Sequence, residues 1–442
     1  MFPSCSFPPF RVRDIHICGN ATPLSSTLRQ WSSLRYKPVE SNIMYSIRTV
    51  SVTEIDEDIS SFLTMVSLFP NVFHLSLSFR SIQIVRFPMS CCNQVEFLSI
   101  SGESIQEIDI SSDSLNKLTA FPSLSCDHLE RINVGPRSLR SVLSIFIEGI
   151  SSLKTLRFER GSCIACESLE LAHLPSLTSI VIGEGAFSSV NPSTYYRLSE
   201  EEKRASGTNS IRVVSFCNLP KLSTFFLADG CFIDTYALKI MGVPQLISFV
   251  TGDSCFAGTE WVDIDMPSIR SLSIGNGSFR FTREASFSGV SNLESFTTGR
   301  FAFHCLTSLD LSHLTKLTQC TIGYRSFENT ESAFFVDLPN LRFFSLDKCA
   351  LENVRTLALE NLPTLQTIII HPYACLRTTF LSLRSLPKLA CVQMEGNEES
   401  ACFLCASYEV ADVRQGVPNC SISPSCFCGR GSILEKALRE TL

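Results

Sequence analysis

The sequence predicts a β-rich repeat solenoid, a fold in which short coils of chain stack on one another. Three observations support it: a fixed period, an alternation of aliphatic residues within the period, and a small residue followed by phenylalanine at its end. Two stretches show the repeat directly, LPSLTSIVIGEGAF at 174–187 and MPSIRSLSIGNGSF at 266–279. Anchor residues recur at spacings of 24, 45, 24, 23, 24, 24, 24, 24 and 24 residues: Ser151, Pro175, Pro220, Pro244, Pro267, Ser291, Thr315, Pro339, Pro363 and Pro387. A fixed period in the range of about 20–50 residues is typical of solenoids.

Each slot, counted in residues after the anchor, has its own chemistry. Aliphatic residues occupy slots 2, 5 and 7, and the alternation at slots 5 and 7, as in Ile180 and Ile182, predicts a short strand with one buried face. A glycine often follows at slot 8, as at Gly183 and Gly252, where we expect a positive φ that turns the chain. Slot 11 is small and slot 12 is usually phenylalanine, which we expect to fill the space between coils.

A second alternating pair precedes each anchor, as in Leu169/Leu171 and Leu357/Leu359. The anchor proline ends this pair because it has no N–H for a strand ladder. One coil therefore reads strand, turn, strand, turn, with no space for a full helix in most repeats.

The segment L-x-x-I-x-I-x-x-x-x-F at 177–187 resembles the leucine-rich repeat family, whose segment reads L-x-x-L-x-L-x-x-N-x-L. The ending I-G-x-x-[SAC]-F resembles the BspA-like subtype of that family. The chain departs from the family at the Asn position, which holds Gly185, Ser254, Gly277 or Arg325, so the backbone groups that an Asn ladder would satisfy need other partners. The resemblance implies a horseshoe solenoid: a parallel concave sheet, with a short second strand or turn on the convex side of each coil of about 24 residues. It also implies non-covalent protein recognition.

Three segments follow from the quality of the repeat. Residues 1–126 read as degenerate N-terminal repeats and a cap, and residues 127–395 as regular 24-residue repeats. The regular part contains an insert at 190–210, which is the most charged segment and is either a binding element or a solvated loop. Residues 396–442 read as a Cys-rich tail or cap that ends in a short helix at 431–442.

Composition excludes several classes of function. The net charge is −6 with no basic run, which argues against nucleic-acid binding. No apolar stretch of about 18 residues is present, so we expect no membrane span. The start of the chain lacks an export signal, and several of the 20 cysteines occupy core slots of the repeat, which together favour a reduced, cytoplasmic protein. A cell-surface or secreted protein is the alternative that the BspA-like resemblance implies.

Catalytic and cofactor motifs are not found in the sequence. It contains no P-loop, no H-E-x-x-H and no G-x-S-x-G, and the seven histidines are scattered, so we expect a protein that is not an enzyme and needs no cofactor. The tail leaves one alternative open, because a loose tail and a zinc site both fit four of its cysteines: Cys402, Cys405, Cys426 and Cys428.

The outward-facing slots of the predicted sheet supply the candidate binding surface. Slot 6 carries Val181, Phe226 and Val250 in consecutive coils, followed by a ladder of hydroxyl residues. Phe226 is exposed if Phe225 is the buried member of the pair. Exposed apolar clusters often mark interaction sites. The predicted contact residues for an unidentified protein partner are Val181, Phe226, Val250, Phe343, Tyr195 and Tyr196.

The predicted function is therefore a non-enzymatic scaffold, a monomer that binds a protein partner on its concave sheet. The alternative is a BspA-like adhesion or host-interaction protein at the cell surface.

Overall fold

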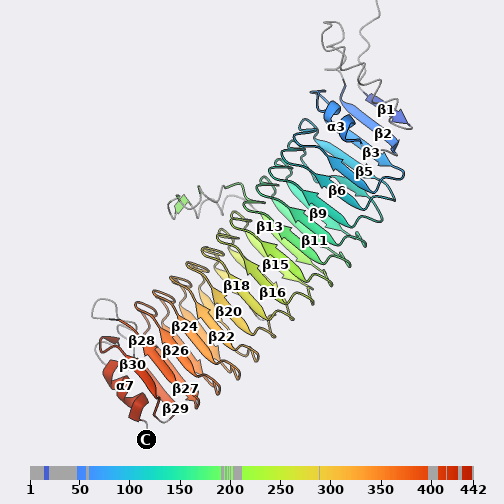
Figure 1. The fold of residues 1–442 in the computed structure, drawn as a ribbon. Coiled ribbons are helices and arrows are strands. Elements are labelled where there is room, and N and C mark those ends of the chain that lie inside the picture. The colour runs from blue at the N-terminus through green and yellow to red at the C-terminus, as the bar shows by residue number, and fades with distance from the viewer. Residues whose placement is uncertain are drawn as a thin grey trace, which may run out of the picture. The chain divides into compact units, whose positions relative to one another are not determined.

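The computed structural model describes residues 14–18, 47–55, 59–190, 194, 197, 199, 201–202, 212–287, 289–396, 407–414, 416–426 and 431–440. The chain divides into two compact units: unit 1 contains residues 1–169 and 173–177, and unit 2 contains residues 170–172 and 178–442. Each unit is a β-solenoid, whose coils have one strand after the anchor, called the front strand here, and one before the next anchor, called the back strand (Figure 1). The predicted fold class, a solenoid of short parallel strands with little helix, is confirmed.

Unit 1 has four front strands in its described part: β4 (Ile84–Phe87), β6 (Glu107–Ile110), β8 (Arg131–Val134) and β10 (Thr155–Phe158). Its back strands are β1 (Asp14–Cys18), β2 (Thr49–Ile55), β3 (His74–Phe79), β5 (Phe97–Ser101), β7 (Ser123–Ser125) and β9 (Ser144–Glu148). Strand β11 (Ser168–Ala172) has residues in both units.

Unit 2 has ten front strands among its described residues: β12 (Ser179–Ile182), β14 (Thr224–Leu227), β16 (Ser248–Thr251), β18 (Ser271–Ile274), β20 (Ser295–Thr298), β22 (Gln319–Ile322), β24 (Phe343–Leu346), β26 (Thr367–Ile370), β28 (Cys391–Met394) and β30 (Asn419–Ile422). Its first group of back strands is β13 (Val213–Cys217), β15 (Ala237–Met241), β17 (Trp261–Asp265) and β19 (Glu284–Ser286). A separate back sheet follows, with β21 (Ser308–Asp310), β23 (Ser332–Val336), β25 (Thr356–Glu360), β27 (Phe380–Leu386) and β29 (Ser407–Val413).

Neighbouring strands pair in parallel, and equal slots lie opposite each other. Thr155 pairs with Arg131 in unit 1, and Ser295 pairs with Ser271 in unit 2. Strands paired in this way lie about 4.8 Å apart. Each slot therefore forms a column from coil to coil, so a run of similar residues becomes a continuous stripe of one chemistry.

The core of unit 2 contains a stack of phenylalanine rings from slot 12. Consecutive rings are nearly parallel, with centroids 4.8 to 5.3 Å apart. The members are Phe187, Phe232, Phe256, Phe279, Phe303 and Phe327. Each ring thus spans the spacing between two coils, as the sequence predicts, and excludes water from the turn.

The prediction that the slot-8 glycines turn the chain with a positive φ is wrong. The positive φ angles lie at slots 10 and 12 instead, as at Gly230 (68°) and Phe232 (57°). The slot-8 glycines are needed for close approach: a Cβ at Gly275 would lie 2.2 Å from the Gly252 carbonyl oxygen, and one at Gly323 would lie 2.3 Å from that of Gly299. Adjacent coils touch backbone to backbone here, and no side chain fits.

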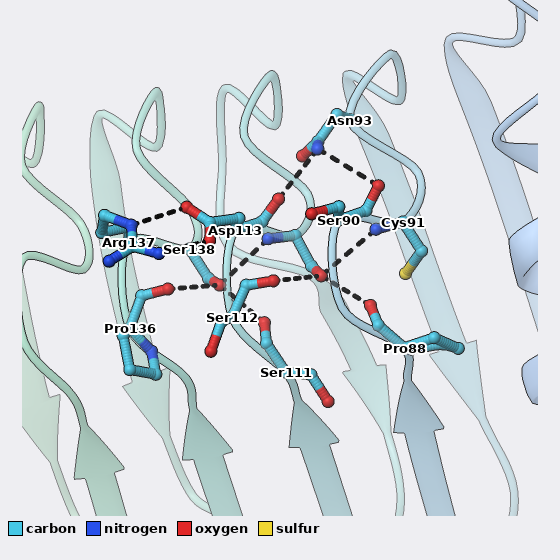
Figure 2. A network of polar contacts seen from close by, with 11 residues as sticks. Pro88, Ser90, Cys91, Asn93, Ser111, Ser112, Asp113, Pro136, Arg137 and Ser138 are labelled. Atoms are coloured by element: carbon cyan, nitrogen blue, oxygen red, sulfur yellow. Dashed lines mark hydrogen bonds and ion pairs between the residues drawn. The ribbon is translucent and has the colours of Figure 1, made fainter.

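Serine hydroxyls at slot 11 satisfy the backbone groups that an Asn ladder would serve. In unit 1 the Ser138 hydroxyl accepts from the Ser114 N–H at 3.1 Å and donates to the Ser111 carbonyl at 2.7 Å (Figure 2). In unit 2 the Ser278 hydroxyl accepts from the Cys255 N–H at 3.0 Å and donates in turn to a backbone carbonyl. A buried oxygen therefore links one coil to the next at the position where the chain reverses.

Helices cover strands near both ends of the described chain. Helix α3 (Ser60–Val66) buries Phe62, Leu63 and Val66 and contacts β4. Helix α7 (Gly431–Glu440) packs on β30 with Leu434 and Leu438 buried. Such covers protect open sheet edges from pairing with other chains.

The segment boundaries at residues 126 and 395 stay predictions. Beyond residue 395, β29 and β30 add one further coil to unit 2 before α7 begins.

The 45-residue spacing between Pro175 and Pro220 leaves the front sheet of unit 2 in register. Ser179 on β12 pairs with Thr224 on β14, so equal slots still face each other. Most of the predicted insert at 190–210 lies outside the described residues.

A buried ion pair joins the two ends of this connection. Ser189, on the entering side, donates from its N–H at 3.3 Å and from its hydroxyl to the Asp234 carboxylate. Arg212, on the returning side, places Nη1 at 3.1 Å from Oδ2 of Asp234. Burial raises the pKa of the Asp234 carboxyl, and the Arg212 charge opposes that shift. The carboxylate of Asp234 thus links the two ends of the long connection.

Candidate functional site

The predicted column Val181, Phe226 and Val250 lies on three neighbouring front strands of unit 2. Phe226 pairs with Val181 on one side and with Val250 on the other. Phe226 is 53% exposed and Val250 is 46% exposed, whereas Val181 is half-buried. These three residues form a continuous apolar strip, called the apolar patch below.

Packing beneath the sheet fixes the orientation of Phe226. Its neighbour Phe225 is 5% exposed, with its ring 4.8 Å from Phe216 on the back strand β13 and 5.5 Å from Phe249 on β16. Because successive strand residues point to opposite faces, burying Phe225 directs Phe226 outward. This confirms the orientation on which the predicted surface depends.

A further exposed apolar residue, Ile247, belongs to the same coil as Val250 and was not among the predicted contact residues. It occupies slot 3 of the Pro244 coil, just before β16, and is 56% exposed. The corresponding slots in the adjacent coils hold Ser223 and Arg270, so the sequence signal for this position is an aliphatic residue between two polar ones.

The other predicted contact residues do not join the patch. Phe343 lies on β24, four front strands beyond Val250, which corresponds to about 19 Å along the sheet. Tyr195 and Tyr196 lie outside the described residues.

The hydroxyl ladder occupies slot 6 between the patch and Phe343. Ser273 pairs with Thr297, Thr297 with Thr321, and Thr321 with Ser345. Ser273, Thr297 and Thr321 are half-buried and Ser345 is buried, so the ladder places small polar groups between two apolar positions on one sheet.

The front strands of unit 1 carry charged and polar side chains at slots 4 and 6. Arg131 donates from Nε to Glu107 at 2.9 Å, and the Asn133 amide donates to the other oxygen of that carboxylate at 3.1 Å. Burial, and then the neighbouring Glu107 charge, raise the pKa of the Asp109 carboxyl, while Arg86 opposes the shift. This face is a network of paired charges.

Anchor prolines line a shallow groove along one edge of unit 2, with a volume of about 460 Å³. Its lining residues come from slot 0 and from two residues before it: His313, Thr315, Asp337, Pro339, Asn361, Pro363, Ser385 and Pro387. His313 Nδ1 lies 3.3 Å from Asp337 Oδ2, and the Asn361 amide donates to Asp337 Oδ1 at 2.8 Å.

Most of the cysteines whose burial the structure describes are buried, whereas Cys217, Cys305, Cys349 and Cys391 are half-buried. Cys231 and Cys255 fill slot 11, and each sulfur lies 3.0 Å from the carbonyl oxygen of Ala228. Cys426 is buried, whereas Cys402, Cys405 and Cys428 lie outside the described residues. Within the described ranges, no cluster of His, Cys, Asp or Glu side chains is suited to hold a metal ion.

The chain is a parallel β-solenoid, and its coil resembles that of leucine-rich repeats: L-x-x-I-x-I front strands in parallel register, short back strands, and a tight turn in place of a helix. No family model matches the chain, and neither does any curated protein. Among solved structures, a leucine-rich repeat protein from Bacteroides ovatus is similar, with 13% sequence identity and a TM-score of 0.22; the match covers 67% of this chain and 82% of that protein. The repeat type therefore rests on the coil itself. In the described part of the chain, no helix has the length and apolar character that crossing a membrane requires.

Proposed function

We propose that this chain is a non-enzymatic scaffold that binds a protein partner on the front sheet of unit 2. The observation that carries the proposal is the exposure of Phe226 and Val250, which pair on neighbouring strands of one sheet. A contiguous apolar patch with polar surroundings often marks an interaction site. The packing of Phe225 holds Phe226 in place, so binding would order little of the scaffold.

The residues beside the apolar patch favour contact with an extended surface of the partner. Ser179, Thr224 and Ser248 at slot 4 place hydroxyl groups beside the apolar side chains. Aromatic residues at the centre of a patch, with polar residues at the rim, are the usual arrangement of binding hot spots.

We also propose a reducing compartment inside the cell, because Cys231 and Cys255 serve as small core residues at a slot that elsewhere holds serine or alanine. The cell-surface alternative predicts instead that native cells release the protein, or expose it to added protease. Fractionation of the native organism, done before the binding experiment below, separates the two.

The binding experiment compares two charge insertions in the same sheet. Phe226→Asp is expected to weaken capture of the native partner by at least about thirtyfold, the effect of losing a hot-spot aromatic, while the thermal midpoint stays within experimental error. Thr297→Asp, at the same slot in the hydroxyl ladder, is the matched control and is expected to keep the partner. Affinity-tagged variants incubated with native extract, followed by mass spectrometry, give the measurement. If Phe226→Asp captures the same proteins as the unmodified chain, the front sheet is not the binding surface.

A further inference from the structure

An acidic row borders the apolar patch on its turn side. Each of the three strands that carry the patch is followed, two residues after its end, by a carboxylate at slot 9: Glu184, Asp229 and Asp253. Asp229 is three residues from Phe226, which limits their Cα separation to about 10 Å. A charged group on a partner that touches Phe226 would therefore lie within about one Debye length of this row at 0.1 M salt.

Hydrogen bonds hold the row together from coil to coil. The Asp253 N–H donates to Asp229 Oδ1 at 2.8 Å, and the Asn276 N–H donates to Asp253 Oδ1 at 2.8 Å. The Arg300 N–H continues the series, donating to Asn276 Oδ1 at 2.8 Å. At Asn276 an amide oxygen accepts the bond that a carboxylate accepts at Asp229. The Asn276 amide also donates from Nδ2 to both oxygens of Asp253, at 3.1 Å and 3.0 Å. The carboxylate of Asp253 is therefore part of the turn, whereas the ladder bond at Asp229 requires an acceptor but not a charge.

The row changes sign along unit 2. After Asn276, slot 9 holds Arg300 and later Lys348, beside the hydroxyl ladder and away from the patch. The opposite edge of the patch carries Lys221, together with Arg270, which lies 3.8 Å from Glu294. Asp229 and Asp253 therefore place negative charge on the turn side of the apolar patch.

We propose that the occupant of the patch is a polypeptide segment with an apolar side chain flanked by lysine or arginine. The apolar side chain would cover Phe226 and Val250, and the basic side chains would lie over Asp229 and Asp253. This inference rests on the proposed function and adds the chemistry of the partner. Complementary charge at an interface rim raises the association rate and rejects partners of like charge.

Three synthetic fluorescent peptides test the proposal. All share the core Leu-Phe-Val, and they carry on each side a pair of lysines, a pair of glutamates or a pair of serines. The lysine peptide is expected to bind the full chain about tenfold more tightly than the serine peptide in about 0.02 M NaCl, with the glutamate peptide weakest. The preference should shrink at about 0.15 M NaCl, because the groups are exposed to screening. Fluorescence anisotropy gives the affinities.

Charge removal that keeps the ladder hydrogen bond tests the row at Asp229. Asp229→Asn retains the acceptor for the Asp253 N–H and is expected to weaken the lysine peptide by about two- to fivefold, without affecting the serine peptide. An unchanged thermal midpoint in this variant shows that the turn is intact.

Two results overturn the inference: equal binding of the lysine and glutamate peptides, or an unchanged lysine preference in Asp229→Asn. Phe226→Ser separates this failure from failure of the proposed function. If it abolishes binding of all three peptides while Asp229→Asn has no effect, the apolar patch stands as the site and only the basic character of the partner is wrong. If the lysine peptide binds Phe226→Ser as well as the unmodified chain, the patch is not part of its site, and the inference fails as stated.

Discussion

The front strands of the two units have the same interior and different surfaces. At the buried slots, Ile132 and Leu156 in unit 1 are as inaccessible as Ile180 and Leu272 in unit 2. At the outward slots of unit 1, charges such as those of Arg131 and Glu107 pair across strands. The outward slots of unit 2 carry hydroxyl residues at slot 4 of the patch coils, and the apolar patch and then the hydroxyl ladder at slot 6.

This difference shows that the inward and outward slots of one repeat have different roles. The inward slots must fill a close-packed interior, so each accepts a narrow set of sizes and polarities. The outward slots need only fit a pleated strand, so their chemistry can differ between coils without changing the fold. Recognition by this chain is therefore encoded in columns that contribute little to its stability.

The largest expected difference in the free energy of unfolding is between variants of two phenylalanines of unit 2. Phe256→Ala removes a ring that lies 4.9 Å from Phe232 and 5.2 Å from Phe279, and it should lower the free energy of unfolding by about 3–5 kcal/mol. Phe226→Ala, the control, should cost less than about 0.5 kcal/mol because its ring is exposed. Urea unfolding followed by circular dichroism measures both. A loss at Phe226 comparable with that at Phe256 would mean that the outward column supports the fold after all.

Buried and exposed charges provide the next contrast. Asp234→Asn removes the carboxylate beside buried Arg212 and should cost about 3–5 kcal/mol, as breaking a buried ion pair usually does. Ser189→Ala removes one hydroxyl donor to the same carboxylate and should cost about 1 kcal/mol. Thermal and urea unfolding report both values. A loss below about 1 kcal/mol at Asp234 would show that its carboxylate does not hold the ends of the long connection.

The smallest effect is expected on the charged face of unit 1. Glu107→Gln removes the partner of Arg131, whose side chain is 45% exposed, and should cost no more than about 1 kcal/mol. Raising the NaCl concentration to about 1 M should reduce the difference from the unmodified chain, since salt screens exposed charges. Urea unfolding at both salt concentrations tests this. A cost above about 2 kcal/mol that does not depend on salt would give this face a structural role like that of the core.

Sequence periodicity was sufficient for the coil, the parallel columns and the outward position of Phe226, because these depend on local alternation and a fixed register. It was insufficient where contacts between coils decide the outcome. The slot-8 glycines are explained by a neighbouring backbone such as that of Gly252, and the role of Asp234 depends on residues on both sides of a long connection. Ile247 can be identified from the sequence, because it is an aliphatic residue at a slot that is polar in both adjacent coils.

The contacts of Asp234 that join the two ends of the long connection have a practical consequence. Because β12 and β14 stay in register across 45 residues, the number of residues between Pro175 and Pro220 is uncoupled from the geometry of the coils around it. A change in the number of residues between these two prolines is expected to cost little, because loop-closure entropy grows slowly with length. This makes the segment a natural place to graft an epitope tag or a fluorescent reporter without disturbing the repeats on either side.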